Sequence, residues 1–449
     1  MTMLIEPSAA PARARSHFHL LSFLLALMNG LGLLMTLLGI LIVVVFANLD
    51  GSGDSGQYMF MALGWSSAAM MLLLLPGLVY AVRRLAGRDS PAFSVPGPRR
   101  MARIGVFLWP LLLLGAYFAS QNDRLAGIIL PPLQILVIGI PIWFFVELSR
   151  SGLPGRKAHQ AWGVFSTGMV VVMPVVFVLE ILLVGGVVIL AASAIMGQNN
   201  LAEELNRLAM RLNSGNLDPE IISRALLPIL RRPAVLVTII LTASGLVPLV
   251  EELFKPLGMW ALSRKRLTPA QGFNLGMVSG AAFALIESLG FLAGVSGPDW
   301  VWTVIGRVGS GLLHITASGL VGWGLAEAWT NKRYGRLALS YLAAVGLHGL
   351  WNLFGLMVGL VPFIDVTAGL VGFLRGLGVI APYALVVIGG GMLTILLLMN
   401  RHLRRQAAQA ALTAGPDPQP QPPVASLADI PASADLDPLE NEADVDGSH

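Results

Sequence analysis

Ionisable side chains interrupt four consecutive apolar runs in the C-terminal half of the chain. Glu251 and Glu252 lie in the first run, Glu287 in the second, His314 in the third and His348 in the fourth. A charged side chain at mid-bilayer costs about 2.5 to 3.5 kcal/mol on insertion scales, so each of them needs a reason to be there. Buried carboxylates can activate water as general bases, and imidazole N–H groups can stabilise an oxyanion.

These side chains are predicted to lie at similar depth. With a rise of about 1.5 Å per residue, the paired glutamates fall near the middle of a helix over residues 234–262. The two histidines fall at the centres of their runs, and Glu287 falls slightly past the middle of its own. We therefore expect them to converge on one polar pocket. Because the set offers Glu and His ligands, the pocket could also hold a zinc ion.

Three further polar residues share helix faces with this set. Lys255 follows Glu251 by four residues, a spacing that permits an ion pair. Arg307 precedes the histidine of its run by two turns, and Asn352 follows the histidine of its run by one turn. We expect the two cations to tune or neutralise the carboxylates, and the Asn352 amide to join the pocket.

The order and spacing of these motifs resemble the PrsW family of bacterial intramembrane proteases, relatives of the CAAX-processing and bacteriocin-processing membrane peptidases. The resemblance covers about residues 234–360 and includes Glu251-Glu252-x-x-Lys255, Phe283-x-x-x-Glu287, His314 and His348-x-x-x-Asn352. It implies hydrolysis of peptide bonds within or beside the membrane.

The resemblance also implies roles for individual residues. The paired glutamates, Glu287 and His314 would activate water, while His348 and Asn352 would hold the scissile carbonyl oxygen. It leaves a glutamate–water and a metal–water mechanism open. In the metal version, the zinc ligands would be Glu252, Glu287, His314 and His348.

Two other functions fit the same residues. Proton relays and ion-coupled transporters also place ionisable groups at the midplane, and Glu180 in an earlier run would suit such a relay. An interhelical hydrogen bond is the simpler role for Glu180. The second alternative is a protein without catalytic activity that binds a membrane partner. New peptide termini would distinguish a protease from both.

Other classes of membrane protease lack their motifs in this chain. Neither His314 nor His348 begins an HExxH sequence, and the two TASG segments within the apolar runs lack the leading glycine of a GxSG element. Those Ser-Gly pairs are more typical of close helix contacts. Asp299 and Asp365 fall in predicted outer loops, which argues against an aspartyl protease, and the absence of cysteine excludes a thiol nucleophile.

The composition identifies the elements that position these residues. The 449 residues are 55% hydrophobic and 12% charged, with a mean hydropathy of +0.74, whereas soluble domains carry about 25% charged residues. We predict an all-α, polytopic transmembrane bundle of about ten spans. The apolar runs lie near 20–47, 57–82, 101–120, 126–147, 162–197, 234–262, 272–294, 301–325, 338–360 and 376–400.

Loop charges predict the orientation. Most of the 29 Lys and Arg fall on one side if both termini are cytoplasmic, as expected for a multi-pass protein of a bacterial inner membrane. Because they are dispersed among loops, they do not indicate nucleic-acid binding. The expected partners are the lipid bilayer and a membrane-anchored protein substrate.

The runs also predict a domain organisation. We expect an N-terminal membrane domain of about five spans over residues 1–197 and an extracytoplasmic amphipathic loop over 198–232. A C-terminal membrane domain with the catalytic helices would cover 233–400. The proline-rich, acidic segment 401–449 would form a disordered cytoplasmic tail.

Overall fold

The protein was analysed as a computed structural model, which describes residues 12–49, 54–92, 99–195, 203, 206–207, 209–210, 232–295, 297, 299–360 and 369–413. Residues 1–407 form one compact unit. The predicted outer loop 198–232 and the tail beyond residue 413 lie almost entirely outside the described residues.

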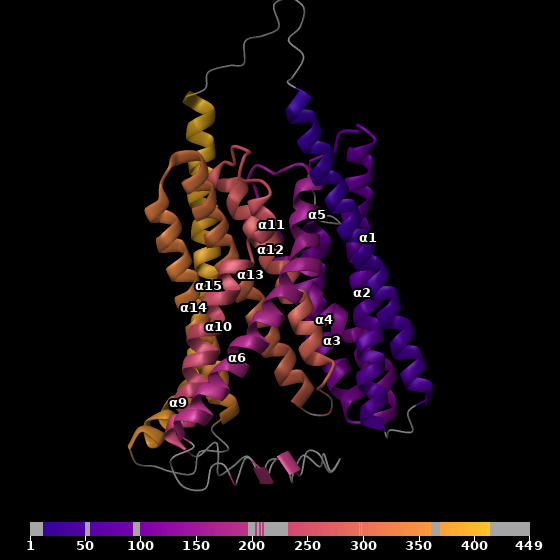
Figure 1. Ribbon diagram of the computed structural model, residues 1–449, viewed down its shortest axis with the longest axis vertical. Coiled ribbons are helices and arrows are strands. Elements are labelled where there is room, and N and C mark those ends of the chain that lie inside the picture. The colour runs from indigo at the N-terminus through magenta and orange to yellow at the C-terminus, as the bar shows by residue number, and fades with distance from the viewer. Residues whose placement is uncertain are drawn as a thin grey trace, which may run out of the picture. The chain divides into compact units, whose positions relative to one another are not determined.

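Helices account for nearly all of the described chain (Figure 1). The N-terminal half contains α1 (Ala12–Leu49), α2 (Asp54–Leu85), α3 (Arg99–Ser120), α4 (Asp123–Arg150), α5 (Ala158–Thr167), the π-helical turn η1 (Gly168–Val172) and α6 (Met173–Ile195). The C-terminal half contains α9 (Pro233–Leu241), the π-helical turn η2 (Thr242–Leu246), α10 (Val247–Phe254), α11 (Leu257–Trp260), α12 (Pro269–Leu292), α13 (Asp299–Asn331), α14 (Tyr334–Leu360) and α15 (Gly369–Thr413).

The structure confirms the polytopic helical bundle. Ten spans among the described residues are long and apolar enough to cross a membrane, and they correspond to the ten predicted runs. The run 162–197 forms one continuous helical span through α5, η1 and α6 as far as Ile195. α15 continues to Thr413, so residues 401–413 are helical and the prediction of a disordered tail beginning at residue 401 was wrong for them.

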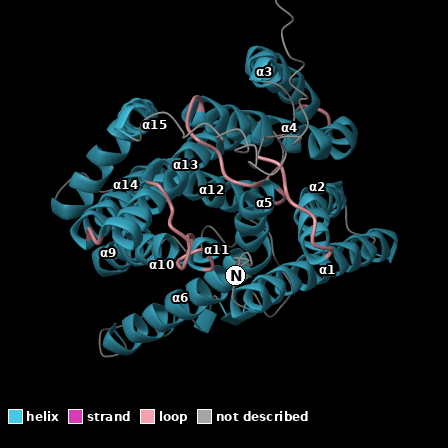
Figure 2. Cartoon of the chain, turned by 90° about the horizontal axis from the view of Figure 1, so that it is seen from above, coloured by secondary structure: helices cyan, strands magenta, loops and turns pink. Residues whose placement is uncertain are grey.

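α12 and α13 form the centre of the bundle (Figure 2). They pack closely because glycines line their contact. A Cβ atom at Gly276 would collide with the carbonyl oxygen of Ser318, and one at Gly280 would collide with the carbonyl oxygen of His314. Small residues at four-residue spacing let transmembrane backbones approach in this way. The contact at Gly280 fixes the position of a candidate site residue directly.

Candidate active site

A π-helical turn sets the direction of the paired glutamates. η2 ends at Leu246, immediately before α10, and both glutamates of α10 point inward, with Glu251 4% and Glu252 0% exposed. Their neighbour Leu253 points outward and is 47% exposed. A π turn adds a residue to one helical turn and so changes which face the following residues present. This local change directly precedes the helix that carries the paired glutamates.

α14 holds that π turn in place. The side-chain amide of Asn352 donates a hydrogen bond to the carbonyl oxygen of Ala243, 2.9 Å away, inside η2. Gly349 allows a close approach, since a Cβ there would collide with the carbonyl oxygen of Ser244. The structure therefore gives the Asn352 amide a backbone partner in η2, and this hydrogen bond does not join it to the glutamates and histidines.

Lys255 lies at the centre of the polar cluster. Its Nζ atom lies 2.8 Å from Glu251 Oε2 and 2.6 Å from Glu252 Oε1, so the ion pair with Glu251 expected from the sequence is present together with a second one. The same atom lies 2.7 Å from His314 Nδ1. The side chain is fully buried, and Ser279 Oγ donates a hydrogen bond to the Lys255 carbonyl oxygen.

The hydrogen bonds assign the tautomer of His314. An ammonium group can only donate, so His314 Nδ1 accepts from Lys255 and the ring proton lies on Nε2. His314 Nε2 then donates to Glu287 Oε2, 2.8 Å away. Arg307 binds the same carboxylate oxygen from the other side. Glu287 thus orients His314 and, with 30% of its side chain exposed, forms the open edge of the cluster.

His348 takes the opposite tautomer. Its Nδ1 atom lies 2.8 Å from Glu252 Oε1 and donates to that carboxylate, which leaves a lone pair on Nε2. The His348 and His314 rings are 5.2 Å apart and meet edge to face. The second oxygen of Glu252, Oε2, is buried and has no hydrogen-bond partner among the described residues. Two acceptor atoms therefore remain available beside the central lysine.

A further carboxylate reaches the site from the N-terminal half. Glu180 of α6 is half-buried, and its carboxyl group lies near that of Glu251. The sequence had indicated an interhelical hydrogen bond or a relay for Glu180. The contact with Glu251 is interhelical, and it brings Glu180 to the cluster.

The donor set fits a divalent metal. Ligand atoms of Glu251, Glu252, His314 and His348 all lie within 4.8 Å of one another, and carboxylate oxygen and imidazole nitrogen are both zinc ligands. The Lys255 ammonium already stands among three of these residues, so the protein positions them around a cation. Metal binding at this point would require Lys255 to move aside. Glu287 lies outside this group of four, which contains Glu251 where the sequence had suggested Glu287.

The geometry explains that difference. The oxygen Oε2 of Glu287 faces the ring nitrogen of His314 that points away from Lys255. A carboxylate behind a ligating histidine is the usual arrangement around protein-bound zinc, where it fixes the tautomer and raises the basicity of the ligand. Glu287 therefore fits the role of a supporting carboxylate better than that of a direct ligand.

These features define a class of protein. The chain is a multi-pass helical membrane protein with a buried glutamate–histidine cluster. Residues 220–405 match the model of a family described as PrsW family intramembrane metalloprotease. The resemblance seen in the motifs is thus confirmed, since residues 220–405 are similar to PrsW-family intramembrane proteases. A search of curated proteins and a search of solved structures gave no match.

Some residues of the site were not evident from the sequence. Ser310 lies one turn before His314, and its Oγ atom is 3.2 Å from the Nε2 atom of that ring. Ser279 binds the backbone of Lys255 from α12. Both serines lie one turn from a motif residue, but serine is common in transmembrane helices as a partner of backbone carbonyls, so the sequence carried little signal for them.

Proposed function

We propose that this protease hydrolyses peptide bonds of membrane-associated protein substrates through a water molecule activated by its glutamate–histidine cluster. The observation that supports this most strongly is that both imidazoles contact carboxylates within one buried cluster, with defined and opposite tautomers. Buried groups that can accept and return protons are what general acid–base hydrolysis requires.

Glu252 is the proposed general base. Its Oε1 atom is held by Lys255 and His348, whereas its buried Oε2 atom has no hydrogen-bond partner among the described residues. Oε2 would accept a proton as the water oxygen attacks the peptide carbonyl carbon. The same carboxylic acid would then give that proton to the departing amine as the carbon–nitrogen bond breaks. Glu251, paired with Lys255, and Glu180 would lie beside this base.

The substrate would enter at the edge formed by Glu287 and Arg307. Glu251, Glu252, His314 and His348 are each at most 4% exposed, while the Glu287 side chain is 30% and the Arg307 side chain 14% exposed. Glu287 and Arg307 would therefore meet the substrate first. In this proposal, His348 contributes its free Nε2 lone pair to the reacting centre, and Asn352 acts as a positioning residue through η2.

A metal would extend this chemistry. Glu251, Glu252, His314 and His348 would hold a zinc ion, which would act as a Lewis acid on the peptide carbonyl oxygen. Elemental analysis of the purified protein would test this. We expect about one zinc per chain and loss of that zinc in a His348→Ala variant. A protein that cleaves its substrate without bound zinc, and whose activity resists chelators, would exclude the metal version.

We also propose a setting for the enzyme. The distribution of Lys and Arg supports a bacterial inner-membrane protein with both termini in the cytoplasm, and a membrane-anchored regulatory protein is the proposed kind of substrate. Residues 1–197 and 233–400 would then be the N-terminal and catalytic membrane domains. Reporter fusions after residues 90 and 413 should both report cytoplasm. An extracytoplasmic signal from either fusion would overturn the orientation.

Profiling of protein N-termini tests the proposed function. Membranes from cells with the wild-type chain are compared with those carrying the Glu251→Gln, Glu252→Gln double variant at matched levels. We expect new termini near transmembrane segments that disappear in the double variant. Glu327→Gln is the control, because Glu327 is also buried and ion-paired but binds Arg333 and Arg336 away from the cluster. Identical termini in the wild type and the double variant would contradict proteolysis and favour a transporter or an idle binding protein.

A further inference from the structure

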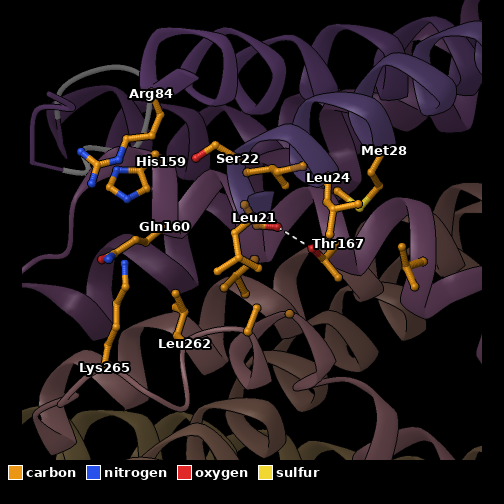
Figure 3. Close-up of a pocket in the computed structure, with 16 residues that line it drawn as sticks. Leu21, Ser22, Leu24, Met28, Arg84, His159, Gln160, Thr167, Leu262 and Lys265 are labelled. Atoms are coloured by element: carbon orange, nitrogen blue, oxygen red, sulfur yellow. Dashed lines mark hydrogen bonds between the residues drawn. The ribbon is translucent and has the colours of Figure 1, made fainter. Parts of the chain in front are cut away.

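A second polar site lies between α1, α2, α5 and the segment after α11. It is a cavity of about 300 Å³ (Figure 3). Arg84, His159, Gln160 and Lys265 are grouped at one end of it, and Leu24, Met28 and Thr167 line the region toward the other end. None of these residues belongs to the glutamate–histidine cluster. The cavity thus combines a cationic end with an apolar end.

The cationic end carries more positive than negative charge. Arg84 lies in the last turn of α2, and Lys265 follows α11. Burial, together with the nearby cations Arg156, Arg84 and Lys157, lowers the pKa of Lys265 to about 8. At the exposed surface nearby, Asp89 pairs with Arg84 and Lys157. An anion in the cavity would relieve the repulsion among these cations.

A buried nitrogen also points to a missing partner. The Nδ1 atom of His159 is buried and has no hydrogen-bond partner among the residues that the structure describes. His159 lies in the first turn of α5 and lines the cavity beside Arg84. Buried polar atoms in proteins are nearly always hydrogen-bonded, so an unpaired one beside a cavity indicates a ligand or an ordered water molecule.

The apolar end faces the lipid. Leu21 and Leu24 line the cavity and are 42% and 48% exposed, so its wall continues onto the apolar outer surface of α1. The predicted orientation puts the segments carrying Arg84, His159 and Lys265 at the cytoplasmic surface. Basic pockets between transmembrane helices at that surface suit anionic lipid headgroups, because the phosphate meets the cations while the acyl chains remain in the bilayer.

We propose that this cavity binds the phosphate group of an anionic phospholipid of the cytoplasmic leaflet. Arg84 and Lys265 bind the phosphate, and His159 adds a hydrogen bond. The acyl chains lie along Leu21 and Leu24 of α1. The bound lipid would tie α1 and α2 to α5 and to the segment that follows the catalytic helix α10.

The test measures lipid retained by the full chain. The protein is purified from nanodiscs containing phosphatidylglycerol or phosphatidylcholine, and bound lipid is counted by native mass spectrometry. We expect at least tenfold more phosphatidylglycerol than phosphatidylcholine on the wild type, and at least a tenfold loss of that preference in Arg84→Gln, Lys265→Gln. The charge-preserving variant Arg84→Lys, Lys265→Arg should retain most of it, which separates loss of charge from loss of folding.

The matched control removes two exposed cations elsewhere. Arg401→Gln, Arg405→Gln should retain the wild-type preference, because both arginines are exposed and neither lines the cavity. Equal phosphatidylglycerol retention by the wild type and the Arg84→Gln, Lys265→Gln variant would overturn the proposal. Binding of inorganic phosphate at this cavity without preference for anionic lipid would also overturn it, since the site would then take a soluble anion.

Discussion

The central C-terminal helices and the first N-terminal helices differ in what surrounds them. In the most apolar 18-residue stretch of α12, 78% is buried within the protein, and in that of α13, 67% is buried. In α1 and α3 the corresponding share is 11%. Most apolar side chains of α1 and α3 therefore lie on the outer surface of the protein, where contact with lipid requires little more than hydrophobicity. The central pair must also fit its neighbours, which is why glycines and serines line its contacts.

The N-terminal half is not uniform in this respect. Its last span, formed by α5, η1 and α6, packs against the helices that carry the glutamate–histidine cluster. A Cβ at Gly168 in η1 would lie 3.0 Å from the Cβ of Ala282, and Glu180 of α6 lies near Glu251. This span precedes the matched region 220–405. The site is therefore assembled from both halves of the chain. Matched substitutions in the N-terminal and C-terminal halves test how much each half contributes to stability and cleavage.

The largest effect should follow removal of the central cation. Lys255→Met would leave two buried carboxylates without their ion pairs, and breaking a buried pair costs about 3 to 5 kcal/mol. We expect a large fall in thermal stability in detergent. The control is Lys157→Met in the N-terminal half, which removes an exposed ion pair and should leave the melting temperature unchanged. Equal falls in melting temperature for Lys255→Met and Lys157→Met would show that the buried ion pairs stabilise the protein no more than the exposed one.

A packing substitution should have the next largest effect. Gly280→Leu would force α12 away from the backbone of His314, and overpacking of this kind costs about 1 to 3 kcal/mol. We expect loss of detectable cleavage and a lower melting temperature. Gly115→Leu on α3 is the matched control, since nothing lies within 4 Å of a Cβ there. Wild-type cleavage by Gly280→Leu would show that the close contact does not position His314.

Glu180→Gln tests whether the N-terminal half contributes to the chemistry. Its carboxyl group lies near that of Glu251, so a neutral amide there should change the electrostatics of the cluster. We expect about a tenfold fall in kcat, or about 1.4 kcal/mol, with KM nearly unchanged and an altered pH profile. Glu147→Gln, which removes a carboxylate paired with Arg150 on α4, should leave both constants as in the wild type.

The smallest effect is expected at the π turn. Asn352→Ala would remove one hydrogen bond to the Ala243 carbonyl, worth about 0.5 to 1.5 kcal/mol. Cleavage should fall several-fold and a small loss of thermal stability should accompany it. If Asn352 instead held the scissile carbonyl oxygen, as the family resemblance implies, cleavage would fall by about 100-fold or more without a loss of stability.

Sequence reasoning predicted the spans well because the membrane imposes a length and a composition on each of them. Because depth follows from helical rise, it also predicted that the glutamates and the two histidines would meet, but its expectation that the Asn352 amide joins them was not met. It could not predict tautomers, the position of Lys255 among three ligands, or the partner of the Asn352 amide. Those depend on side-chain torsions and on the π turn η2, whose register change leaves no clear mark in the residues 242–246.

The most direct test of the account is cleavage by Glu252→Gln. A purified chain is reconstituted in lipid with a transmembrane peptide containing a site found by terminus profiling, and cleavage is compared with that by Glu327→Gln at equal helical content. We predict a fall of at least about 100-fold for Glu252→Gln and wild-type cleavage for Glu327→Gln. Full activity of Glu252→Gln would contradict the role of this carboxylate as the base that activates water.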